Sequence, residues 1–593
     1  MPNNILGGIK KSVVGMIQTW TSHEHSFLIV VAGVLGIVCG LAVVVLQRLL
    51  ELFHDTAFGM PSKWLGADSG WYLYLVIPLI PAFGGLIVGF MTWRFKMGYE
   101  SAAGCEPMKW AALDGGLVKP RTIWFRLLAT VAFLGSGGSG GREGPIAQIC
   151  GALGSAIGQL FKMSTDRLRL LVGCGAAAGI AAAFNAPIAG VIFTVELVLG
   201  DFNVISFLPI VISSVMATTT KRLFLGDVPA FVAPSYSLVS HWEILFYAIL
   251  GIVCGLIARL FFVSYFKSYD FFGKKLKNHP VLRPAVGGLI VGVIGMFAPQ
   301  IFGGGYEVMG DMLNGAIVWY VAFGLIFLKI IATSISLGSD GSGGIFAPSL
   351  FIGCMTGGVF GTVVHYLFPD ITAAAGAYAM VGVGAVMAAA VHAPLTNILM
   401  GYELTGNYLI ILPIMTACIM STYVMTRFSD YSLYTEKLRR RGIELVHGRD
   451  ISVMDKIKVA DVMRRHVTTI PENLAFGKVM ELIANSRDSY FPMVDSKDRL
   501  CGIVSIQNVR EFMLDSSDLC DLVVAKEIAT ENVITVTGRH NLNEAMEKFA
   551  MIDIEQLPVV SHDDPRKIEG MLSRIDVIAA YKKEVLKKKE KEE

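Results

Sequence analysis

The sequence Gly135-Ser-Gly-Gly-Ser-Gly-Gly-Arg-Glu-Gly-Pro145 returns later in the chain as Gly338-Ser-Asp-Gly-Ser-Gly-Gly-Ile-Phe-Ala-Pro348. Seven of the eleven positions match, and the two copies start 203 residues apart (338 minus 135). A second pair of motifs follows in the same order: Asn185-Ala-Pro-Ile precedes Glu196, and His392-Ala-Pro-Leu precedes Glu403, 207 residues later (403 minus 196). The chain therefore contains two related halves.

The segments around these motifs are too apolar for a soluble protein. Of 593 residues, 53% are hydrophobic and 17% are charged, and the first long apolar run, Phe27 to Val45, carries no charge. Similar runs continue to about Met425, but many are shorter than the roughly 20 residues of a simple span, and glycine and proline interrupt them. We therefore expect an all-α polytopic membrane domain with broken helices.

Repeated halves with interrupted segments at matching positions indicate a transporter whose binding site lies where the halves meet. Each glycine-rich motif ends in a proline and precedes an apolar run, which is typical of a turn that opens a helix. The unpaired N–H groups at a helix start carry about half a positive charge and suit a small anion. We therefore predict an anion site where Gly140–Pro145 and Gly343–Pro348 come together.

Glu143 lies in the middle of the first motif, where a carboxylate inside a membrane is costly and indicates a functional group. When ionised, its carboxylate is able to occupy an anion position and block the path. When protonated, it loses its attraction to the amides and moves away, which couples permeation to pH. The alternative is an ion pair with Arg142 that only anchors the turn.

Four features together resemble the CLC family of chloride channels and chloride/proton exchangers. They are Gly141-Arg-Glu-Gly-Pro145, Gly344-Ile-Phe-Ala-Pro348, the Asn185-Ala-Pro187 segment and a tyrosine, Tyr434, after the last apolar run. The resemblance covers nearly the whole chain. It implies a subunit of 18 helices with inverted-repeat halves, and a homodimer with one pore in each subunit.

The resemblance also assigns roles to residues. Glu143 becomes the gating glutamate, the amides of Ile345 and Phe346 hold the central anion, and the Tyr434 hydroxyl contacts it. Other anion-binding positions implied by the same motifs are Gly141, Arg142, Gly144 and Gly344. Taken alone, Tyr434 also fits an interfacial aromatic residue.

Two departures from the family pattern bear on selectivity and transport mode. Where the family has Gly-Ser-Gly-Ile-Pro, this chain has Ser101-Ala-Ala-Gly-Cys-Glu-Pro107. Ala102 takes the serine position when no gap is allowed, and Gly104 takes it when the prolines are aligned. Neither residue has a hydroxyl, so the motif does not distinguish chloride from nitrate, bromide or fluoride.

The second departure is Leu197, which stands where family exchangers often carry a proton-accepting glutamate. Leucine carries no proton, so this position favours a passive channel, with a chloride/proton antiporter as the alternative. The adjacent Glu196 and its repeat mate Glu403 are expected to be structural and to cap buried backbone groups.

The composition changes at Arg427–Arg441, where four arginines and a lysine interrupt the apolar pattern. We expect residues 1–440 to form the membrane domain and 441–458 a linker. Two soluble α/β units should follow, because Phe491-Pro-Met-Val-Asp and Leu557-Pro-Val-Val-Ser begin similar stretches. These units, 459–518 and 519–593 with a basic C-terminal tail, resemble a tandem pair of cystathionine-β-synthase (CBS) domains.

In CBS pairs a hydroxyl and a carboxylate contact the phosphate and ribose of an adenine nucleotide. By this resemblance, Ser573 and Asp576 are candidate nucleotide-binding residues in the second unit. Ser505 and Asn508 are the equivalents in the first unit, with an amide in place of the acid.

Other functional classes fit the sequence less well. Gly135–Gly140 satisfies the G-x-G-x-x-G pattern of a dinucleotide-dependent enzyme, but it lies between membrane segments rather than in a soluble βαβ unit. A CBS-regulated cation channel would need acidic pore residues. We therefore expect no enzyme activity, no required cofactor and no metal site. The net charge of +2 gives no sign of nucleic-acid binding.

Orientation and location are further expectations. The basic pair Lys10-Lys11 and the soluble C-terminal part indicate that both termini are cytosolic. The plasma (inner) membrane is the expected location of this multi-pass protein.

Overall fold

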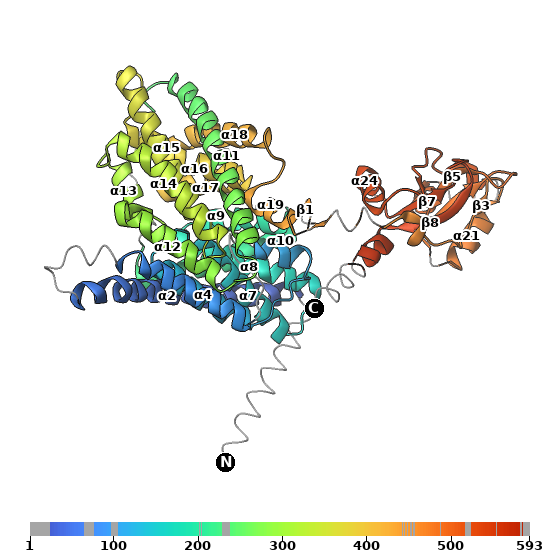
Figure 1. Ribbon diagram of the computed structural model, residues 1–593. Helices are drawn as coiled ribbons and strands as arrows, with labels where there is room; N and C mark the ends of the chain where they lie inside the picture. The colour runs from blue at the N-terminus through green and yellow to red at the C-terminus, as the bar shows by residue number, and fades with distance from the viewer. Residues whose placement is uncertain are drawn as a thin grey trace, which may run out of the picture. The chain divides into compact units, whose positions relative to one another are not determined.

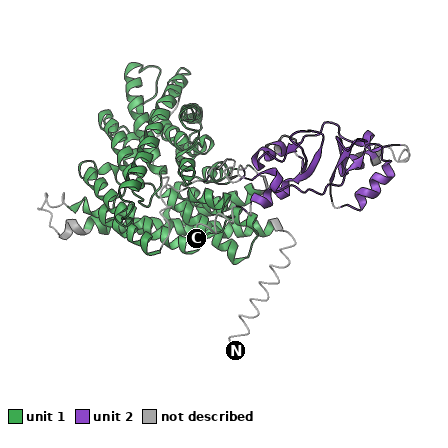
Figure 2. Ribbon diagram, turned by 45° about the vertical axis from the view of Figure 1, so that its right-hand side comes forward, with its two compact units in different colours: residues 1–441 green, residues 442–593 purple. Residues whose placement is uncertain are grey.

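The computed structural model divides the chain into two compact units, residues 1–441 and residues 442–593 (Figure 2). The described residues are 24–64, 76–95, 105–200, 204–227, 238–441, 457–486, 488–515, 523–552 and 554–581, together with 202, 443, 445–446, 449–450, 454 and 584. Ala102, Gly104, the Lys10-Lys11 pair and most of the basic C-terminal tail lie outside them.

The first unit is built from helices throughout its described residues (Figure 1). In chain order they are α2 (Glu24–Trp64), α4 (Leu79–Phe95), α5 (Glu106–Ala112), α6 (Arg121–Gly135), α7 (Glu143–Leu160), α8 (Thr165–Phe184), α9 (Pro187–Phe193), α10 (Val204–Leu225), α11 (Glu243–Lys275), α12 (Leu282–Phe297), α13 (Tyr306–Leu313), α14 (Trp319–Gly338), α15 (Phe346–Leu367), α16 (Ala375–Val391), α17 (Pro394–Thr405), α18 (Ile411–Thr426) and α19 (Leu433–Arg439).

Many of these helices are suited to a bilayer. Among the described residues, seven helices are long and apolar enough to cross a membrane. Four apolar helical segments are shorter, including α16, which is buried on nearly every face although it carries almost only apolar residues. An apolar helix that protein rather than lipid surrounds belongs to the interior of a large helical domain. The first unit is therefore an integral membrane domain with broken helices, as the sequence predicts.

The two sequence halves fold in the same way. Helix α2 packs on α10 as α11 packs on α18, and α7 packs on α8 as α15 packs on α16. The pairs α4 with α12 and α9 with α17 join the halves. The α4–α12 contact is reciprocal, because Gly85 lies against the Pro284 carbonyl and Gly288 lies against the Pro81 carbonyl with no room for a side chain. Such mutual contacts are the mark of two-fold symmetry between related elements.

The Asn-Ala-Pro and His-Ala-Pro motifs break the helices at equivalent points. Helix α8 ends at Asn185, whose φ of 62° is left-handed, and α16 ends at His392, whose φ is 56°. Left-handed residues terminate helices, and the following proline suits the first turn of the next helix. Pro187 and Pro394 accordingly begin α9 and α17.

The second unit contains two three-stranded sheets with the same topology. The first has strands β3 (Ile470–Pro471), β4 (Tyr490–Val494) and β5 (Leu500–Ser505), and the second has β6 (Val536–Thr537), β7 (Gln556–Val560) and β8 (Ile568–Ser573). In each sheet the first two strands are parallel and the last two antiparallel. The helices are α21 (Phe476–Ala484), α22 (Ile506–Asp515), α23 (Ala525–Ile528) and α24 (Leu542–Ile552). This α/β architecture matches the expected pair of repeated units.

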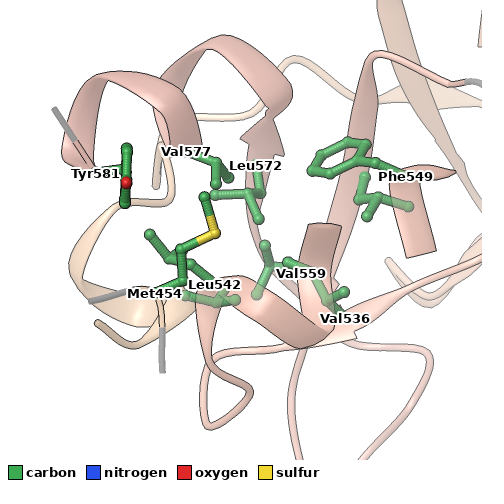
Figure 3. Packing of buried hydrophobic residues seen from close by; sticks show 11 residues of the cluster. Met454, Val536, Leu542, Phe549, Val559, Leu572, Val577 and Tyr581 are labelled. Carbon is green, nitrogen blue, oxygen red and sulfur yellow. The ribbon is translucent and has the colours of Figure 1, made fainter. Parts of the chain in front are cut away.

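Even an irregularity of the sheets is repeated. The β4–β5 register shifts between Met493 and Val494, and the β7–β8 register shifts between Val559 and Val560. Each sheet has its own apolar core, and the second is formed by residues such as Leu542, which packs with its neighbours in Figure 3. The residues expected to form a linker include a short antiparallel hairpin, β1 (Leu445–Val446) with β2 (Arg449–Asp450).

Candidate functional site

The two glycine-rich motifs meet each other directly. The Gly141 N–H donates to the Gly344 carbonyl at 2.8 Å, and the Gly344 N–H donates to the Gly141 carbonyl at 2.7 Å. Helix α7 begins two residues after Gly141, and α15 begins two residues after Gly344. The two helix starts are thereby joined, as the predicted anion site requires.

The first turns of α7 and α15 have backbone N–H groups without a partner in their own helices, as every helix start does. These amides include those of Gly144 in α7 and Phe346 in α15. The N-cap residues Arg142 and Ile345 form no side-chain cap. Ile345 and Phe346 are fully buried. The N–H groups of Gly141 and Gly344 are engaged with each other, so their contribution is to join the motifs.

Glu143, at the first position of α7, is only 1% exposed. Its Oε1 accepts a short hydrogen bond from the Tyr306 hydroxyl at the start of α13. The Arg142 Nε lies 3.9 Å from the same oxygen, at the outer limit of an ion pair. Among the described residues, no group donates a hydrogen bond to Oε2, which is also buried. A buried polar atom without a hydrogen-bond partner is unusual in a folded protein and calls for an explanation.

Arg142 does more than pair with Glu143. Its guanidinium lies 5.6 Å from the centre of the Tyr306 ring, within the range of a cation–π contact. The Arg142 side chain is one-quarter exposed, whereas that of Glu143 is buried. The closer partner of Glu143 is therefore Tyr306, and the interpretation of Glu143 as half of an anchoring ion pair with Arg142 loses support.

Tyr434 is buried, with 2% of its surface exposed. It occupies the first turn of α19, which Ser432 and Thr435 cap by mutual hydrogen bonds of their side chains with each other's N–H groups at 3.2 and 2.8 Å. Such burial does not fit an aromatic residue at the membrane surface.

Glu196 and Glu403 have the reciprocal structural role that their place in the repeat predicts. The Glu196 carboxylate accepts the Leu395 and Thr396 N–H groups at 3.1 and 2.8 Å, at the start of α17. The Glu403 carboxylate accepts the Ile188 and Ala189 N–H groups at 2.9 and 2.7 Å, at the start of α9. Each half therefore caps a helix of the other half.

Leu197 follows Glu196 in a π-helical turn over Thr194–Leu199 and is buried. Its side chain provides no proton acceptor at this position. Gly200, with a left-handed φ of 66°, ends the turn.

Three polar residues to which the sequence did not point form hydrogen bonds within the first unit: Tyr306, which is half-buried, and Lys329 and Glu106, which are buried. Tyr306 bonds Glu143 from 163 positions away. Lys329, the only charged residue of α14, is fully buried and donates to the Ile301 and Gly303 carbonyls at 2.9 and 2.8 Å. Glu106 is 3% exposed and accepts a short hydrogen bond from Gln148 of α7. A single lysine in an apolar helix was the one visible signal, since intramembrane charges indicate function.

A cleft of the second unit gathers the candidate nucleotide-binding residues of its second repeat. Its polar lining comes from Arg464, His466, Thr468, Asp488, Tyr490, Gln556, Ser573 and Asp576. The Arg464 guanidinium donates to the Asp576 carboxylate at 3.0 and 3.3 Å, and the Ser573 hydroxyl donates to it at 2.6 Å. The hydrogen bond to Asp576 raises the pKa of the Arg464 guanidinium. Both a cation and a carboxylate therefore line this cleft.

The equivalent residues of the first repeat, Ser505 and Asn508, form the same local hydrogen-bonded pair as Ser573 and Asp576, but their surroundings differ. The Ser505 hydroxyl donates to the Asn508 side-chain oxygen at 2.5 Å, and the Asn508 N–H donates to the Ser505 oxygen at 3.1 Å. Arg464 pairs by backbone hydrogen bonds with Met571, and Thr530 pairs in the same way with Ile503. Threonine thus stands where the second repeat's cleft has arginine. The structure brings Ser573 and Asp576 into a cleft, and Ser505 and Asn508 do not line it.

Comparison with protein families identifies both units. Residues 84–426, more than half of the chain, match the family model described as voltage gated chloride channel. Residues 459–515 and 525–583 each match the CBS domain.

Individual relatives give the same pattern. A ClcB-like chloride channel protein of Ralstonia nicotianae is 34% identical over 70% of this chain and 97% of its own length. An H(+)/Cl(-) exchange transporter, ClcA, of Vibrio parahaemolyticus is 31% identical over 74% of this chain and 94% of its own. The chloride channel protein CLC-f of Arabidopsis thaliana is 26% identical over 92% of this chain and 79% of its own.

Solved structures have the same fold. A slow cyanobacterial Cl-/H+ antiporter has a TM-score of 0.64 at 27% identity, and the match covers 70% of this chain and 97% of that one. A eukaryotic CLC transporter has a TM-score of 0.63 at 18% identity and covers 93% of this chain and 97% of its own, so the likeness extends over both units.

Proposed function

Because the chain belongs to the voltage-gated chloride channel family, we propose that its membrane unit moves chloride across the bilayer in exchange for protons, with Glu143 as the gate. The observation that carries this proposal is the place of Glu143. Its carboxylate is buried where two helix starts, those of α7 and α15, are joined by the Gly141–Gly344 hydrogen bonds. A carboxylate at an anion-binding site formed by helix-start amides competes with the transported anion.

The protonation state of Glu143 decides whether its carboxylate or chloride occupies the site formed by the helix-start amides. The ionised carboxylate is attracted to the helix-start amides and excludes chloride. Once Glu143 takes up a proton, that attraction is lost and the anion replaces it at amides such as those of Ile345 and Phe346. We expect the hydroxyl of Tyr434, which is buried, to donate to the same anion. Alternation of chloride and proton at one place couples their movement.

Exchange is a better proposal than the passive channel that Leu197 favours. Relatives at about 30% identity are named H(+)/Cl(-) exchange transporters, and the solved structure at 27% identity is a Cl-/H+ antiporter. Because Leu197 carries no proton, exchange requires that protons reach Glu143 by a path without a carboxylate at position 197. Water in the membrane interior is the simplest carrier.

Chloride flux from liposomes with simultaneous recording of external pH tests the proposal. Purified full-length protein is reconstituted with a chloride gradient and no pH gradient. An exchanger drives protons uphill as chloride runs down its gradient, and a protonophore abolishes that pH change. Chloride movement without any proton movement would establish a channel. Replacement of chloride by fluoride or nitrate in the same assay gives the selectivity that Ala102 and Gly104 leave open.

We also propose an assembly and a location for the protein. We expect a homodimer with a separate pathway in each subunit, situated in the plasma (inner) membrane with both termini in the cytosol. Crosslinking in native membranes tests the dimer, and accessibility of tags at both ends tests the orientation.

A regulatory role for the second unit is favoured by its cleft. Asp576 is suited to accept ribose hydroxyls, and Arg464, with His466 and Thr468 beside it, to bind phosphate. We propose that an adenine nucleotide binds here and tunes transport. The Ser505–Asn508 pair has no carboxylate, so the proposal places one nucleotide in each chain rather than two.

A further inference from the structure

The hydroxyl of Tyr306 is the one hydrogen-bond donor that the described structure gives to the Glu143 carboxylate. Tyr306 comes from the second half of the chain, and Glu143 comes from the first. The phenol ring also contacts the Arg142 guanidinium, which lies 5.6 Å from its centre. Tyr306 therefore contacts both the gate residue and the residue before it.

The turn that presents Tyr306 is fastened from two directions. The Gly303 carbonyl accepts the Gly140 N–H at 3.2 Å and the Lys329 ammonium at 2.8 Å. Lys329 also donates to the Ile301 carbonyl. Gly305, with a left-handed φ of 78°, then turns the chain into α13, whose first residue is Tyr306. The Lys329 ammonium also lies 5.0 Å from the centre of the Phe351 ring. Burial of an ammonium group costs free energy unless it is paired, and its hydrogen bonds to the two carbonyls hold the turn in one conformation.

Three groups besides Tyr306 act electrostatically on the Glu143 carboxylate or on its surroundings. Arg142 lies 3.9 Å away on the same motif. Tyr434 is buried in the first turn of α19. Lys329, on α14, bonds the turn that leads to Tyr306. In the described structure none of these three groups donates a hydrogen bond to the carboxylate, whereas Tyr306 does. A donor to a carboxylate stabilises its ionised form and so opposes protonation.

We infer that Tyr306 is a latch for the gate: its hydroxyl holds the Glu143 carboxylate in place and sets the pH at which the gate opens. This inference rests on the proposed gating role of Glu143 and adds a positioning residue to it. Lys329 supports the latch by fixing the turn. The Tyr306–Glu143 hydrogen bond must break whenever Glu143 moves. The latch therefore slows the opening of the gate and also shifts that opening to lower pH.

The test is the pH profile of chloride flux for Tyr306→Phe in liposomes. Phenylalanine keeps the ring and its contact with Arg142 but loses the donor. One hydrogen bond to a charged group corresponds to a shift of about one to two pH units. We expect the half-activation pH to rise by that amount and the flux at neutral pH to increase. Tyr247→Phe is the matched control, because its hydroxyl donates to another buried glutamate, Glu243, at 3.2 Å.

Two further variants separate failure of the latch from failure of the gate. In Glu143→Gln the pH dependence disappears if Glu143 is the gate, and Tyr306→Phe then adds no pH-dependent effect on that background. If the chloride flux of Glu143→Gln is independent of pH but Tyr306→Phe has the wild-type pH profile, the role of Tyr306 is wrong and the gating role of Glu143 is retained. If Glu143→Gln keeps the wild-type profile, the gate itself is wrong.

The role of Lys329 has a separate readout. Lys329→Met removes the bonds to the turn, and we expect a rise in the half-activation pH in the same direction as for Tyr306→Phe. In the double variant, Lys329→Met should add little to the shift in half-activation pH caused by Tyr306→Phe, since both substitutions act through the Tyr306–Glu143 hydrogen bond. Fully additive shifts would show that Lys329 acts independently of the latch. Thermal unfolding of each purified variant in detergent confirms that the protein is folded.

Discussion

Gly141 and Gly344 donate their backbone N–H groups to each other's carbonyls, at 2.8 and 2.7 Å, although 203 positions separate them. This pair of bonds joins the two halves of the membrane unit at the starts of α7 and α15. A Cβ on Gly344 would approach the Gly144 nitrogen to 2.9 Å, closer than side-chain carbons normally come. Both glycines are thus required by the contact between the motifs.

Gly344→Ala should separate the two helix starts. Overpacking of this kind destabilises a protein by about 1–3 kcal/mol, and we expect chloride flux to fall at least about tenfold because the amides lose their common target. Gly324→Ala is the control, since nothing lies within 4 Å of a Cβ at that position on α14. Flux assays and thermal unfolding measure both variants. Wild-type flux in Gly344→Ala would show that the close contact is unimportant for transport.

Removal of one reciprocal cap should lower stability without changing the stoichiometry of transport. Glu403→Ala leaves two N–H groups at the start of α9 without their acceptor, and loss of a helix cap costs about 0.5–2 kcal/mol. Glu196→Ala should behave alike at α17. Glu51→Ala, which breaks an exposed ion pair with Arg48, should have almost no effect on the thermal midpoint. An altered proton-to-chloride ratio in Glu196→Ala would give this residue a part in proton transfer.

Asp495 should make the β4–β5 turn sensitive to acid. The Arg499 and Lys497 N–H groups, together with the Arg499 guanidinium, bond its carboxylate and lower its pKa. A lowered pKa contributes stability above the unfolded value of about 3.9, and this stability is lost as pH falls through the native pKa.

Hydrogen exchange of the hairpin measures that effect. In Asp495→Asn the amides of β4 and β5 should exchange faster than in the wild type at pH 7, after correction for intrinsic rates, and the difference should shrink below about pH 4. Asp498→Asn in the same turn is the control, because asparagine also tolerates the left-handed φ of 57° there. A difference between Asp495→Asn and wild type that stays constant with pH would exclude the carboxylate's ionisation as its cause.

Nucleotide binding should depend on Asp576 and not on Asn508. Calorimetric titration of the full-length protein with AMP, ADP and ATP should give about one site in each chain. Asp576→Ala removes the expected ribose acceptor, and we expect affinity to fall at least about tenfold. Asn508→Ala should leave affinity unchanged. Equal loss in both variants would indicate two equivalent sites, and no heat of binding to the wild type would leave the cleft without a nucleotide.

The sequence was most informative where the repeat constrains it. The glycine motifs, the Ala-Pro breaks and the paired Glu196 and Glu403 predicted the duplicated halves and the capping roles, because equivalent residues in a symmetric fold meet equivalent partners. The short apolar runs likewise predicted broken helices. The second unit's repeated strands followed from the same kind of internal comparison.

What the sequence could not predict depends on contacts between distant segments. Tyr306 reaches Glu143 only because Gly303 and Gly305 turn the chain there, and no local pattern encodes that approach. The hairpin within the expected linker forms from only two residues in each strand, too few for a periodic signal. Leu197 favoured a passive channel, whereas the relatives support exchange, because one missing side chain does not exclude another path for the proton.

The pH dependence of chloride flux in Glu143→Gln tests the gate most directly. Glutamine keeps the size of the side chain but does not titrate, and Glu307→Gln, an exposed glutamate on α13, is the control. We predict that wild-type and Glu307→Gln flux decreases as pH rises, whereas Glu143→Gln flux is the same at every pH and no longer moves protons. A Glu143→Gln profile that follows the wild type would contradict the assignment of Glu143 as the gate.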